Sequence, residues 1–331
     1  MSDNVSVFRP QKDKLVPSPQ VTVVIPSYKA SDTIERAVFS VLGQPGVQVG
    51  VIVVIDDNCA TTENKVRKIA DPRVHVFVND HNRGAPFSRN RGLEAAGSPY
   101  VMFLDSDDYL TGDVLEGLVK AMLAEQADLG FAPWIRLNEA TNDISRRRPE
   151  FQSAAHAFSA WLIDQKSIPP CSVLWRTDFV RFIGGWDEDL KRIQDGEIVL
   201  RGLLKDSKIC LSQQSAGVYF QHASEHRITA SSDHSPIITF ARKLLDQDSS
   251  VVDLAARQHI IARYLYRNAK KAFRNGDVIF GRSALSLSRE LGLAKNDGSV
   301  PGRLGAWLLG VENYQRLLGA IRKGRRVTPD L

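Results

Sequence analysis

Four short, mainly apolar runs recur along the first third of the chain, and the first two are separated by a stretch of helical periodicity. The runs cover residues 21–25, 51–55, 74–78 and 101–104. Between the first two, apolar residues recur at the spacing of a helix, namely Ile34, Ala37, Val38, Val41 and Leu42. Strands that are apolar on both faces and alternate with helices are typical of a parallel sheet. The pattern predicts an α/β fold with a mostly parallel central sheet and helices on both faces.

Polar side chains stand where these runs end. Tyr28 follows the first run, Asp57 follows the second, and Asp105 to Asp107 follow the fourth. Ligands of open parallel sheets bind outside the carboxyl ends of the strands. We therefore expect these residues to share one edge of the sheet and to form a ligand site there.

The densest of these clusters places three carboxylates, those of Asp105, Asp107 and Asp108, within four positions. An unpaired carboxylate near an apolar interior loses hydration, which a cation can offset. Mg²⁺ prefers one or two carboxylates together with phosphate oxygens. The cluster favours a metal–diphosphate site, with a solvated acidic turn that caps the next segment as the alternative. For Asp108 we expect the capping role.

The C-terminal third has helical periodicity from about residue 236. One apolar stripe comprises Leu304, Trp307, Leu308, Val311, Tyr314, Leu318 and Ile321, and is followed by the basic residues Arg322, Lys323, Arg325 and Arg326. A basic amphipathic helix can lie in a membrane interface. Residues 303–326 are thus a candidate contact with the inner membrane surface; packing on the rest of the chain or on a second subunit is the alternative.

Composition narrows the class of protein without changing the fold. The chain has 331 residues, of which 43% are hydrophobic and 24% charged, as in ordinary globular proteins. We see no signal peptide, and no apolar run approaches the ~20 residues that span a bilayer. The three cysteines have no metal-like spacing, which fits a reducing compartment. We expect a cytoplasmic protein that can associate peripherally with the membrane.

The net charge of +5 is unevenly distributed. Residues 1–222 hold 25 Lys and Arg against 28 Asp and Glu, whereas residues 223–331 hold 18 against 10. A basic protein suggests nucleic acid as a partner. Because the basic excess lies away from the sheet-edge residues and no reader motif is present, we expect no nucleic-acid partner.

Seven motifs in series resemble the family 2 inverting glycosyltransferases, which have the GT-A fold. They are Ile25-Pro26-Ser27-Tyr28, Ile55-Asp56-Asp57, Asn82-Arg83-Gly84, Ser88-Arg89-Asn90-Arg91-Gly92, Phe103-Leu104-Asp105-Ser106-Asp107-Asp108, Gly184-Gly185-Trp186-Asp187-Glu188 and Gln194-Asp195-Gly196-Glu197. The resemblance implies a catalytic GT-A domain over residues 20–230, with a nucleotide-binding half (20–110) and an acceptor half (111–230). An N-terminal tail (1–19) and a helical C-terminal region (231–331) flank it.

For the donor, the resemblance implies a set of nucleotide-sugar contacts. Tyr28 would stack on the base, Asp57 would accept from its N–H edge, and Arg89 would reach the base or the diphosphate. The full expected set is Pro26, Ser27, Tyr28, Asp57, Arg89, Asp105 and Ser106. Uridine is the expected base.

A divalent metal, Mn²⁺ or Mg²⁺, would bridge the two donor phosphates. The resemblance assigns Asp107 as a metal ligand and Asp105 to the metal's water shell or the donor ribose. His222 would complete the metal shell or touch the diphosphate, with a purely structural histidine as the alternative. Arg227, just beyond, would neutralise leaving-group charge from a loop.

For the acceptor, Asp195 is the expected general base, which takes the proton of the attacking hydroxyl. Its alternative role is to cap the helical run that follows. Glu197 is a fallback base or an acceptor contact. Gly185 would allow close approach of the backbone, and Trp186 would be a platform for a sugar ring or, alternatively, a core residue.

Together these features predict an inverting, metal-dependent glycosyltransferase. It would move a sugar from a nucleoside-diphosphate sugar to a hydroxyl of a saccharide acceptor, lipid-linked, in surface-polysaccharide synthesis such as exopolysaccharide, capsule or O-antigen. The alternatives are a nucleotidyltransferase, a non-catalytic nucleotide-sugar sensor and a basic nucleic-acid-binding protein. An oligomer is compatible with all of them.

Overall fold

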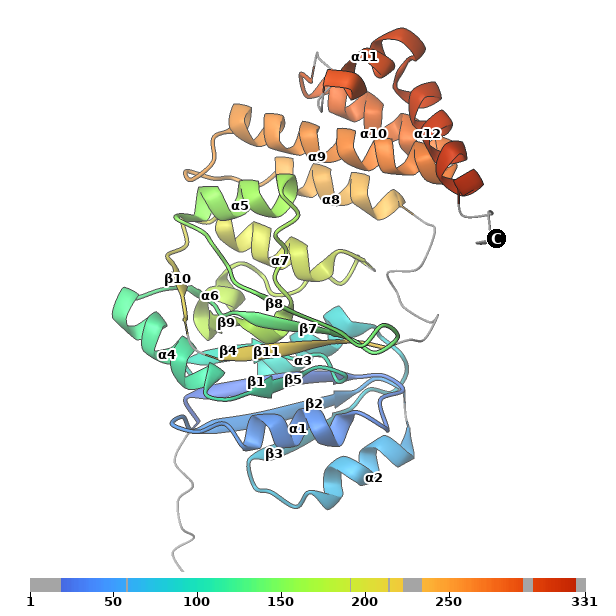
Figure 1. Cartoon of the computed structure of the whole chain (residues 1–331). Helices are drawn as coiled ribbons and strands as arrows, with labels where there is room; N and C mark the ends of the chain where they lie inside the picture. The colour runs from blue at the N-terminus through green and yellow to red at the C-terminus, as the bar shows by residue number, and fades with distance from the viewer. Residues whose placement is uncertain are drawn as a thin grey trace, which may run out of the picture.

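A computed structural model of the chain describes residues 19–57, 59–190, 192–213, 215–222, 234–293 and 300–325. Its centre is a seven-stranded sheet in the order β10-β6-β9-β4-β1-β2-β3 (Figure 1). The strands are β1 (Val21–Ser27), β2 (Val49–Ile55), β3 (Val74–Val78), β4 (Tyr100–Phe103), β6 (Leu129–Phe131), β9 (Val173–Arg176) and β10 (Ile209–Leu211). Only β9 runs antiparallel to its neighbours in this sheet. The predicted α/β fold with a mostly parallel sheet is confirmed.

The register of the parallel strands gathers their carboxyl ends at one edge. In the β1–β2 pair, Ser27 lies opposite Ile55, and in the β1–β4 pair, Val24 lies opposite Phe103. The residues that follow these strands therefore emerge side by side. This is the edge at which the polar side chains were expected.

Helices cover both faces of the sheet because side chains alternate along each strand. Val23 and Ile25 of β1 belong to an apolar cluster with α1 (Ile34–Leu42) and α4 (Val114–Glu125). Val24 faces the other way, into a cluster with α3 (Ala85–Ala95). At Gly92 of α3 a Cβ would lie 2.3 Å from the Val24 side chain, so only glycine allows this helix to lie so close.

A second, four-stranded sheet lies beside the first in the order β5-β11-β7-β8. Its strands are β5 (Tyr109–Thr111), β7 (Trp134–Asn138), β8 (Asp143–Arg147) and β11 (Ala216–Gln221). Strand β11 pairs antiparallel with β5, which directly follows the acidic run, and parallel with β7. This pairing brings the end of β11 back to the carboxyl edge of the main sheet.

The remaining helices are α2 (Ala60–Lys68), α5 (Ala154–Ile163), the 3₁₀ turn η1 (Pro170–Ser172), α6 (Thr177–Phe182), α7 (Gln194–Leu203), α8 (Ser235–Leu245), α9 (Leu254–Asn275), α10 (Val278–Glu290), α11 (Val300–Leu309) and α12 (Val311–Arg325). Of these helices, α2 lies at the lower end of the molecule in Figure 1, whereas α5 and α7 to α12 extend it above the sheet. One apolar cluster runs from the sheet through α5 and α7 into α8, α9 and α10. The helical C-terminal region thus shares a core with the sheet.

The predicted continuous helix over the apolar stripe of residues 304–321 is wrong. The chain turns at Gly310, whose φ is +73°, and divides into α11 and α12. Val311 is buried, and the Tyr314 ring contacts Gly305 of α11. Part of the expected stripe therefore packs inside this helical pair, while Leu304, Trp307 and Leu308 remain exposed on α11.

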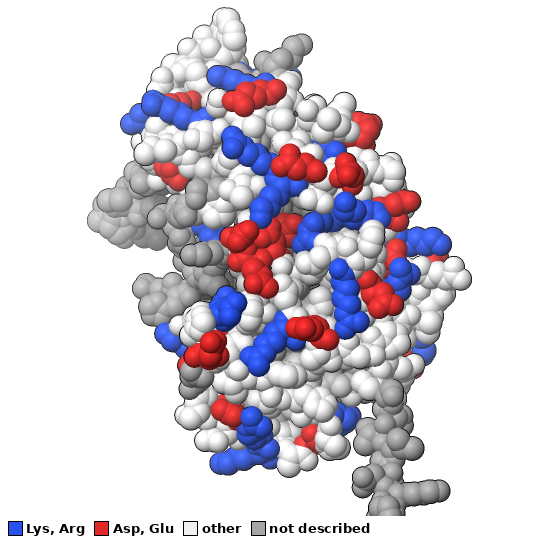
Figure 2. Space-filling model, turned by 180° about the vertical axis from the view of Figure 1, so that it is seen from behind, with Lys and Arg blue, Asp and Glu red and all other residues white. Residues whose placement is uncertain are grey.

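No helix among the described residues is long and apolar enough to cross a membrane. Figure 2 shows the face opposite to that of Figure 1, and on it Lys and Arg side chains lie among Asp and Glu side chains. This face carries no continuous basic stripe over the described residues.

Candidate active site

The edge begins with the residues that end β1 and β2. Pro26 and Ser27 are buried within β1, whereas the Tyr28 side chain is 49% exposed. Asp57 accepts hydrogen bonds from the backbone N–H groups of Lys29 at 2.5 Å and Cys59 at 3.1 Å. The Asp57 carboxylate therefore connects the loop after β1 to the loop after β2. The Tyr28 ring beside it remains half-exposed to solvent.

A buried polar network supports this edge, and the sequence reasoning did not assign it. The Asp56 carboxylate, which is 3% exposed, accepts from the backbone N–H groups of Arg83 and Gly84 at 2.8 and 2.7 Å. It also accepts from Asn79 Nδ2 at 2.7 Å. The signal in the sequence was the acidic pair Asp56-Asp57 after an apolar run, in which only Asp57 was given a role.

The three acidic residues after β4 have different environments. Asp105 accepts a 2.6 Å hydrogen bond from Arg89, and its side chain is 28% exposed. The Asp107 side chain is 40% exposed, with its Oδ2 3.6 Å from His222 Nε2. Ser106, between them, is half-buried. Asp105 and Asp107 thus face different partners although only one residue separates them.

Asp108 does not cap the segment that follows it, contrary to our expectation. Its side chain is fully buried, and its Oδ1 accepts from the backbone N–H of Phe220 at 2.8 Å. Burial, and then the nearby carboxylates of Asp105 and Asp107, raise the pKa of Asp108 well above its usual value. Asp108 joins the acidic run to β11, a connection across 112 residues that a local pattern cannot indicate.

That connection positions His222, which follows β11. The imidazole lies 4.6 Å from the Phe220 ring, between centroids, and contacts Asp107 on one side and Glu139 Oε2, at 3.6 Å, on the other. Arg36 stacks over Phe220 and donates to the backbone oxygen of Asp107 at 2.6 Å. The structure therefore brings the two expected metal ligands, Asp107 and His222, together.

The donor set available to a metal here is small. Among the described residues no group of three or more His, Cys, Asp or Glu side chains is arranged to hold an ion. One carboxylate and one imidazole, both partly exposed, suit a divalent ion that takes its other ligands from a diphosphate and water. Asp107 and His222 fit that description.

Asp195 lies in the first turn of α7, but it is not the N-cap. That position belongs to Ile193, whose φ is +64°. The Asp195 side chain is 46% exposed, yet its Oδ1 is buried without a hydrogen-bond partner among the described residues. Burial raises the pKa of Asp195 to about 6, with the Arg89 charge opposing this rise and the Asp105 charge adding to it.

Arg89 is buried among carboxylates, and the expected contact with a nucleotide stays a prediction. The side chain is 4% exposed, and its guanidinium is turned toward carboxylates within the protein. The same nitrogen that donates to Asp105 lies 3.6 Å from Asp195 Oδ1. Asp105 and Asp195, 90 positions apart in the chain, therefore share one edge of the molecule.

The predicted acceptor contacts other than Asp195 are also interior residues. Trp186 is 4% exposed, with its ring against Phe103 at 5.0 Å and under the Arg89 guanidinium at 4.2 Å. Asn90 fixes its backbone by accepting from the Trp186 N–H and donating to the Trp186 carbonyl. This burial supports the core-residue alternative for Trp186, and its role as a sugar platform stays a prediction.

Glu197 and Gly185 belong to the same buried support. Both Glu197 carboxylate oxygens accept from Arg201, at 2.7 and 2.9 Å, and Arg201 also donates to the Gly185 carbonyl at 2.6 Å. Gly185 has a φ of +65°, and a Cβ there would meet Asn90 Oδ1 at 2.7 Å. Neither residue presents a group to an acceptor, because packing and the Arg201 ion pair already occupy them.

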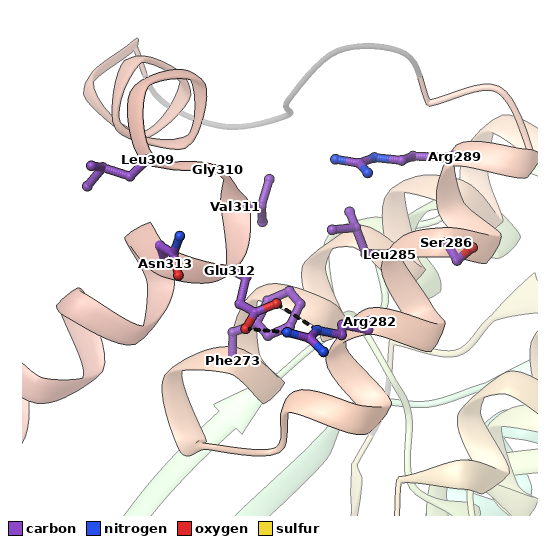
Figure 3. Close-up of a pocket in the computed structure, with 10 residues that line it drawn as sticks. All are labelled: Phe273, Arg282, Leu285, Ser286, Arg289, Leu309, Gly310, Val311, Glu312 and Asn313. Carbon is purple, nitrogen blue, oxygen red and sulfur yellow. Dashed lines mark hydrogen bonds and ion pairs between the residues drawn. The ribbon is translucent and has the colours of Figure 1, made fainter.

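Two further parts of the chain bear on the site. Arg227 lies outside the described residues. A groove of about 590 Å³ lies far from the sheet edge, between α10 and the turn joining α11 to α12 (Figure 3). Its charged side chains are Arg282, Arg289 and Glu312, of which the first and last form an ion pair. With its one carboxylate paired, the groove has no free base for proton transfer.

The sheet edge thus has a half-exposed aromatic ring, a carboxylate–imidazole pair and a partly buried carboxylate whose pKa is raised to about 6. The family described as Glycosyl transferase family 2 matches residues 22–179. This chain carries a family 2 glycosyltransferase domain. The match covers β1 to α6, and so includes every donor-side residue discussed above but not Asp195 or His222.

Curated relatives of this family 2 domain align over about a third of the chain. The succinoglycan biosynthesis protein ExoO of Rhizobium meliloti is 40% identical over 111 residues, which cover 34% of this chain and 32% of ExoO. The Escherichia coli UDP-Glc:alpha-D-GlcNAc-diphosphoundecaprenol beta-1,3-glucosyltransferase WfgD is 35% identical over 103 residues, 31% of this chain and 41% of WfgD. The alignments thus span less than half of either relative.

Likeness of structure extends further than likeness of sequence. Residues 1–349 of TarS from S. aureus, solved in complex with UDP-GlcNAc, superpose with a TM-score of 0.67 over 92% of each chain, at 18% sequence identity. The fold of the family 2 domain and much of the helical region is therefore that of a GT-A glycosyltransferase.

Proposed function

We propose that this chain is an inverting glycosyltransferase that moves a sugar from a nucleoside-diphosphate sugar to a hydroxyl group of a saccharide acceptor. The observation that carries the proposal is that Arg89 contacts both Asp195 and Asp105, and that Asp105 stands two residues before Asp107. Inversion by direct displacement needs a leaving-group site and a base on opposite sides of one sugar ring. The edge offers acidic residues for both tasks.

Asp195 is the proposed base. It takes the proton from the acceptor hydroxyl as that oxygen bonds to the anomeric carbon. The bond between the anomeric carbon and the diphosphate oxygen breaks at the same time, and the electron pair leaves with the nucleoside diphosphate. A carboxylate with a pKa of about 6 is largely ionised at neutral pH yet basic enough to receive a proton.

Asp107 and His222 would hold a divalent metal ion, Mn²⁺ or Mg²⁺, whose chemistry is to neutralise the charge that develops on the departing diphosphate. The pairing of their side chains at 3.6 Å supports this assignment. Arg36 supports Asp107 through a hydrogen bond to its backbone oxygen, and Phe220 supports His222 through a ring contact.

The donor nucleotide is proposed to bind over Tyr28. The ring of Tyr28 is half-exposed at the end of β1, and Asp57 beside it fixes the surrounding backbone. Pro26 and Ser27 would form the base of the proposed nucleotide site, and Asp105 and Ser106 would contact the ribose and the phosphates. We propose UDP as the nucleotide because WfgD is named for a UDP-linked donor and TarS was solved with one.

The proposed acceptor is a lipid-linked saccharide at the inner face of the cytoplasmic membrane, in surface-polysaccharide synthesis. Names of the relatives refer to succinoglycan and to a diphosphoundecaprenol acceptor. The exposed residues Leu304, Trp307 and Leu308 share one face of α11 and offer an apolar contact for a lipid surface.

The test is a screen of nucleotide sugars for Mn²⁺-dependent binding, followed by assays of sugar transfer and of donor hydrolysis without acceptor. Asp195→Asn should bind the productive donor as the wild type does and lose turnover by about 10²–10⁴-fold. Arg67→Met, on the exposed surface of α2, is the control. Normal turnover by Asp195→Asn would refute the assignment of the base.

The same screen separates the alternative functions. A nucleotide-sugar sensor would bind the donor with metal and release no nucleotide with any acceptor. A nucleotidyltransferase would form diphosphate from a nucleoside triphosphate. A nucleic-acid-binding protein would show steep salt dependence, and the mixed charges in Figure 2 give no support to it.

A further inference from the structure

Arg89 is a buried cation whose contacts all lie within the protein. It stands on α3 with 4% of its side chain exposed. A charge removed from water is costly unless it is paired and hydrogen-bonded. The buried guanidinium therefore requires hydrogen-bond and ion-pair partners. The identity of these partners indicates the role of Arg89.

The partners come from both halves of the active site. One guanidinium nitrogen donates to Asp105 Oδ1 at 2.6 Å and lies 3.6 Å from Asp195 Oδ1. The other donates to Gln194 Oε1 at 3.2 Å, on the residue just before Asp195. Arg89 thus contacts the loop after β4 and the first turn of α7 at the same time.

A rigid aromatic support fixes the plane of the guanidinium. Arg89 Cζ lies 4.2 Å from the centre of the Trp186 ring, within the range of a cation–π contact. Trp186 is held in turn by two hydrogen bonds between its backbone and the Asn90 side chain, at 2.8 and 2.9 Å. Because Asn90 is the next residue of α3, this helix supplies both the Arg89 guanidinium and the side chain that fixes Trp186.

We propose that Arg89 is a positioning residue that orients the Asp195 carboxylate and holds it in the ionised form. This inference rests on the proposed function, in which Asp195 is the base. In this inference Arg89 acts on the general base Asp195 rather than on the nucleotide, and Trp186 supports Arg89.

Among the described residues, two charged groups act on Asp195 from outside α7: Arg89 on α3 and Asp105 after β4. On α7 itself, Glu197 is neutralised by Arg201. An opposite charge within about 4 Å favours the charged form of a carboxyl group by 1–3 pKa units. Loss of the Arg89 charge should therefore make Asp195 harder to ionise.

The experiment compares Arg89→Met and Arg89→Lys with the wild type in the pH dependence of kcat and in KM for the donor. Arg89→Met should move the acidic limb of the profile upward by about one pH unit or more, with KM unchanged. Arg89→Lys keeps the charge but not the planar fork, so the limb should stay while kcat falls. Arg67→Met should change neither.

A second measurement needs no turnover. Carbon NMR of protein labelled at aspartate, with Asp195 assigned through Asp195→Asn, reports its titration directly. The Asp195 pKa should rise in Arg89→Met and fall in Asp105→Asn, which removes the competing negative charge. This measurement separates failure of the inference from failure of the proposed function, because it holds whichever substrate the protein uses.

Two results would overturn the inference. One is a large rise in KM for the donor in Arg89→Met with the acidic limb unmoved, which would make Arg89 a nucleotide contact. The other is an Asp195 titration that neither variant shifts. If Arg89→Met fails to fold, Arg89→Lys and Asp105→Asn still decide between these outcomes.

Discussion

At the scale of single residues, the acidic side chains of the sheet edge differ more in surroundings than in type. Asp107 is 40% exposed and lies beside His222, whereas its neighbour Asp108 is fully buried against β11. Asp195 is in between, with one oxygen buried and the rest of the carboxylate accessible. Three chemically identical groups can therefore serve as metal ligand, structural link and base.

The raised pKa of Asp195 predicts how activity depends on pH. A group whose pKa is about 6 is protonated below that value and cannot accept a proton, so turnover should rise with pH through about 6 and then level off. Steady-state kcat between pH 4.5 and 8.5 checks this. A profile that is flat across pH 6 would contradict the prediction, provided that the protein stays folded.

The pair of Asp107 and His222 predicts a dependence on metal that can be divided between two residues. His222→Ala should weaken the apparent affinity for Mn²⁺ by about 10-fold or more and leave binding of metal-free nucleotide unchanged, because one of two protein ligands is lost. Asp107→Asn should have a larger effect, since it removes the negative charge.

The measurement for this pair is calorimetric titration of Mn²⁺ in the presence of UDP. His156→Ala is the matched control, because that histidine stands on α5, where it contacts Phe151 and the backbone of Gln152. Wild-type affinity in both His222→Ala and Asp107→Asn would remove them as ligands.

At the scale of elements, the placement of β11 decides whether the site is complete. The strand carries His222 at its end and is held to the acidic run by the bond from the Phe220 N–H to Asp108. Near its start it lies against the η1 turn, where a Cβ on Gly217 would be 2.2 Å from the backbone oxygen of Cys171. A backbone atom cannot rotate away as a side chain does, so the strand itself would have to move.

Gly217→Ala should therefore destabilise the protein by about 1–3 kcal/mol and also weaken Mn²⁺ binding through displacement of His222. Gly97→Ala is the matched control, because a Cβ at Gly97 meets no atom within 4 Å. Urea unfolding measures the free energy, and the titration above measures the metal. Equal stability of the two variants would show that β11 tolerates the shift.

At the scale of the whole molecule, the C-terminal helices extend the core and expose an apolar face. The apolar cluster that includes α5 and α7 continues into α8 to α10, so the helices are fixed to the domain that holds the site. On α11, Leu304, Trp307 and Leu308 are 55%, 75% and 64% exposed. Residues spaced by three and four lie on one side of a helix, so these three form one surface.

Replacement of Leu304 and Trp307 by Ser should abolish binding to vesicles that contain anionic lipid, because the apolar contact is lost, while the fold remains intact. Vesicle sedimentation measures the bound fraction. Phe182→Ser is the control, since Phe182 is 74% exposed but stands on α6. Point variants are preferable to deletion of residues 303–331, because Val311 and Ala306 are buried and their loss would expose the core. Equal binding by the double variant and the wild type would remove α11 as a membrane contact.

The sequence was sufficient for four of the seven strands of the main sheet, β1 to β4, but not for β6, β9 and β10. The strands at 21–25, 51–55, 74–78 and 101–104 were found because a strand buried on both faces needs uninterrupted apolar residues, and this need is local. The helix after β1 followed from its periodicity. The break at Gly310 was missed because one apolar stripe is equally consistent with a continuous helix and with two helices that pack on each other.

What the sequence alone determined is therefore the first four strands, the helix after the first of them and the set of polar residues at the strand ends. Only the tertiary structure decided which of these polar residues face a ligand. Arg89, Trp186 and Glu197 were predicted as ligand contacts, but partners distant in sequence, such as Asp105, Phe103 and Asn90, or packed on the same helix, as Arg201 is, enclose them. Burial and charge pairing depend on everything that surrounds a side chain in space, whereas periodicity reports only its own element.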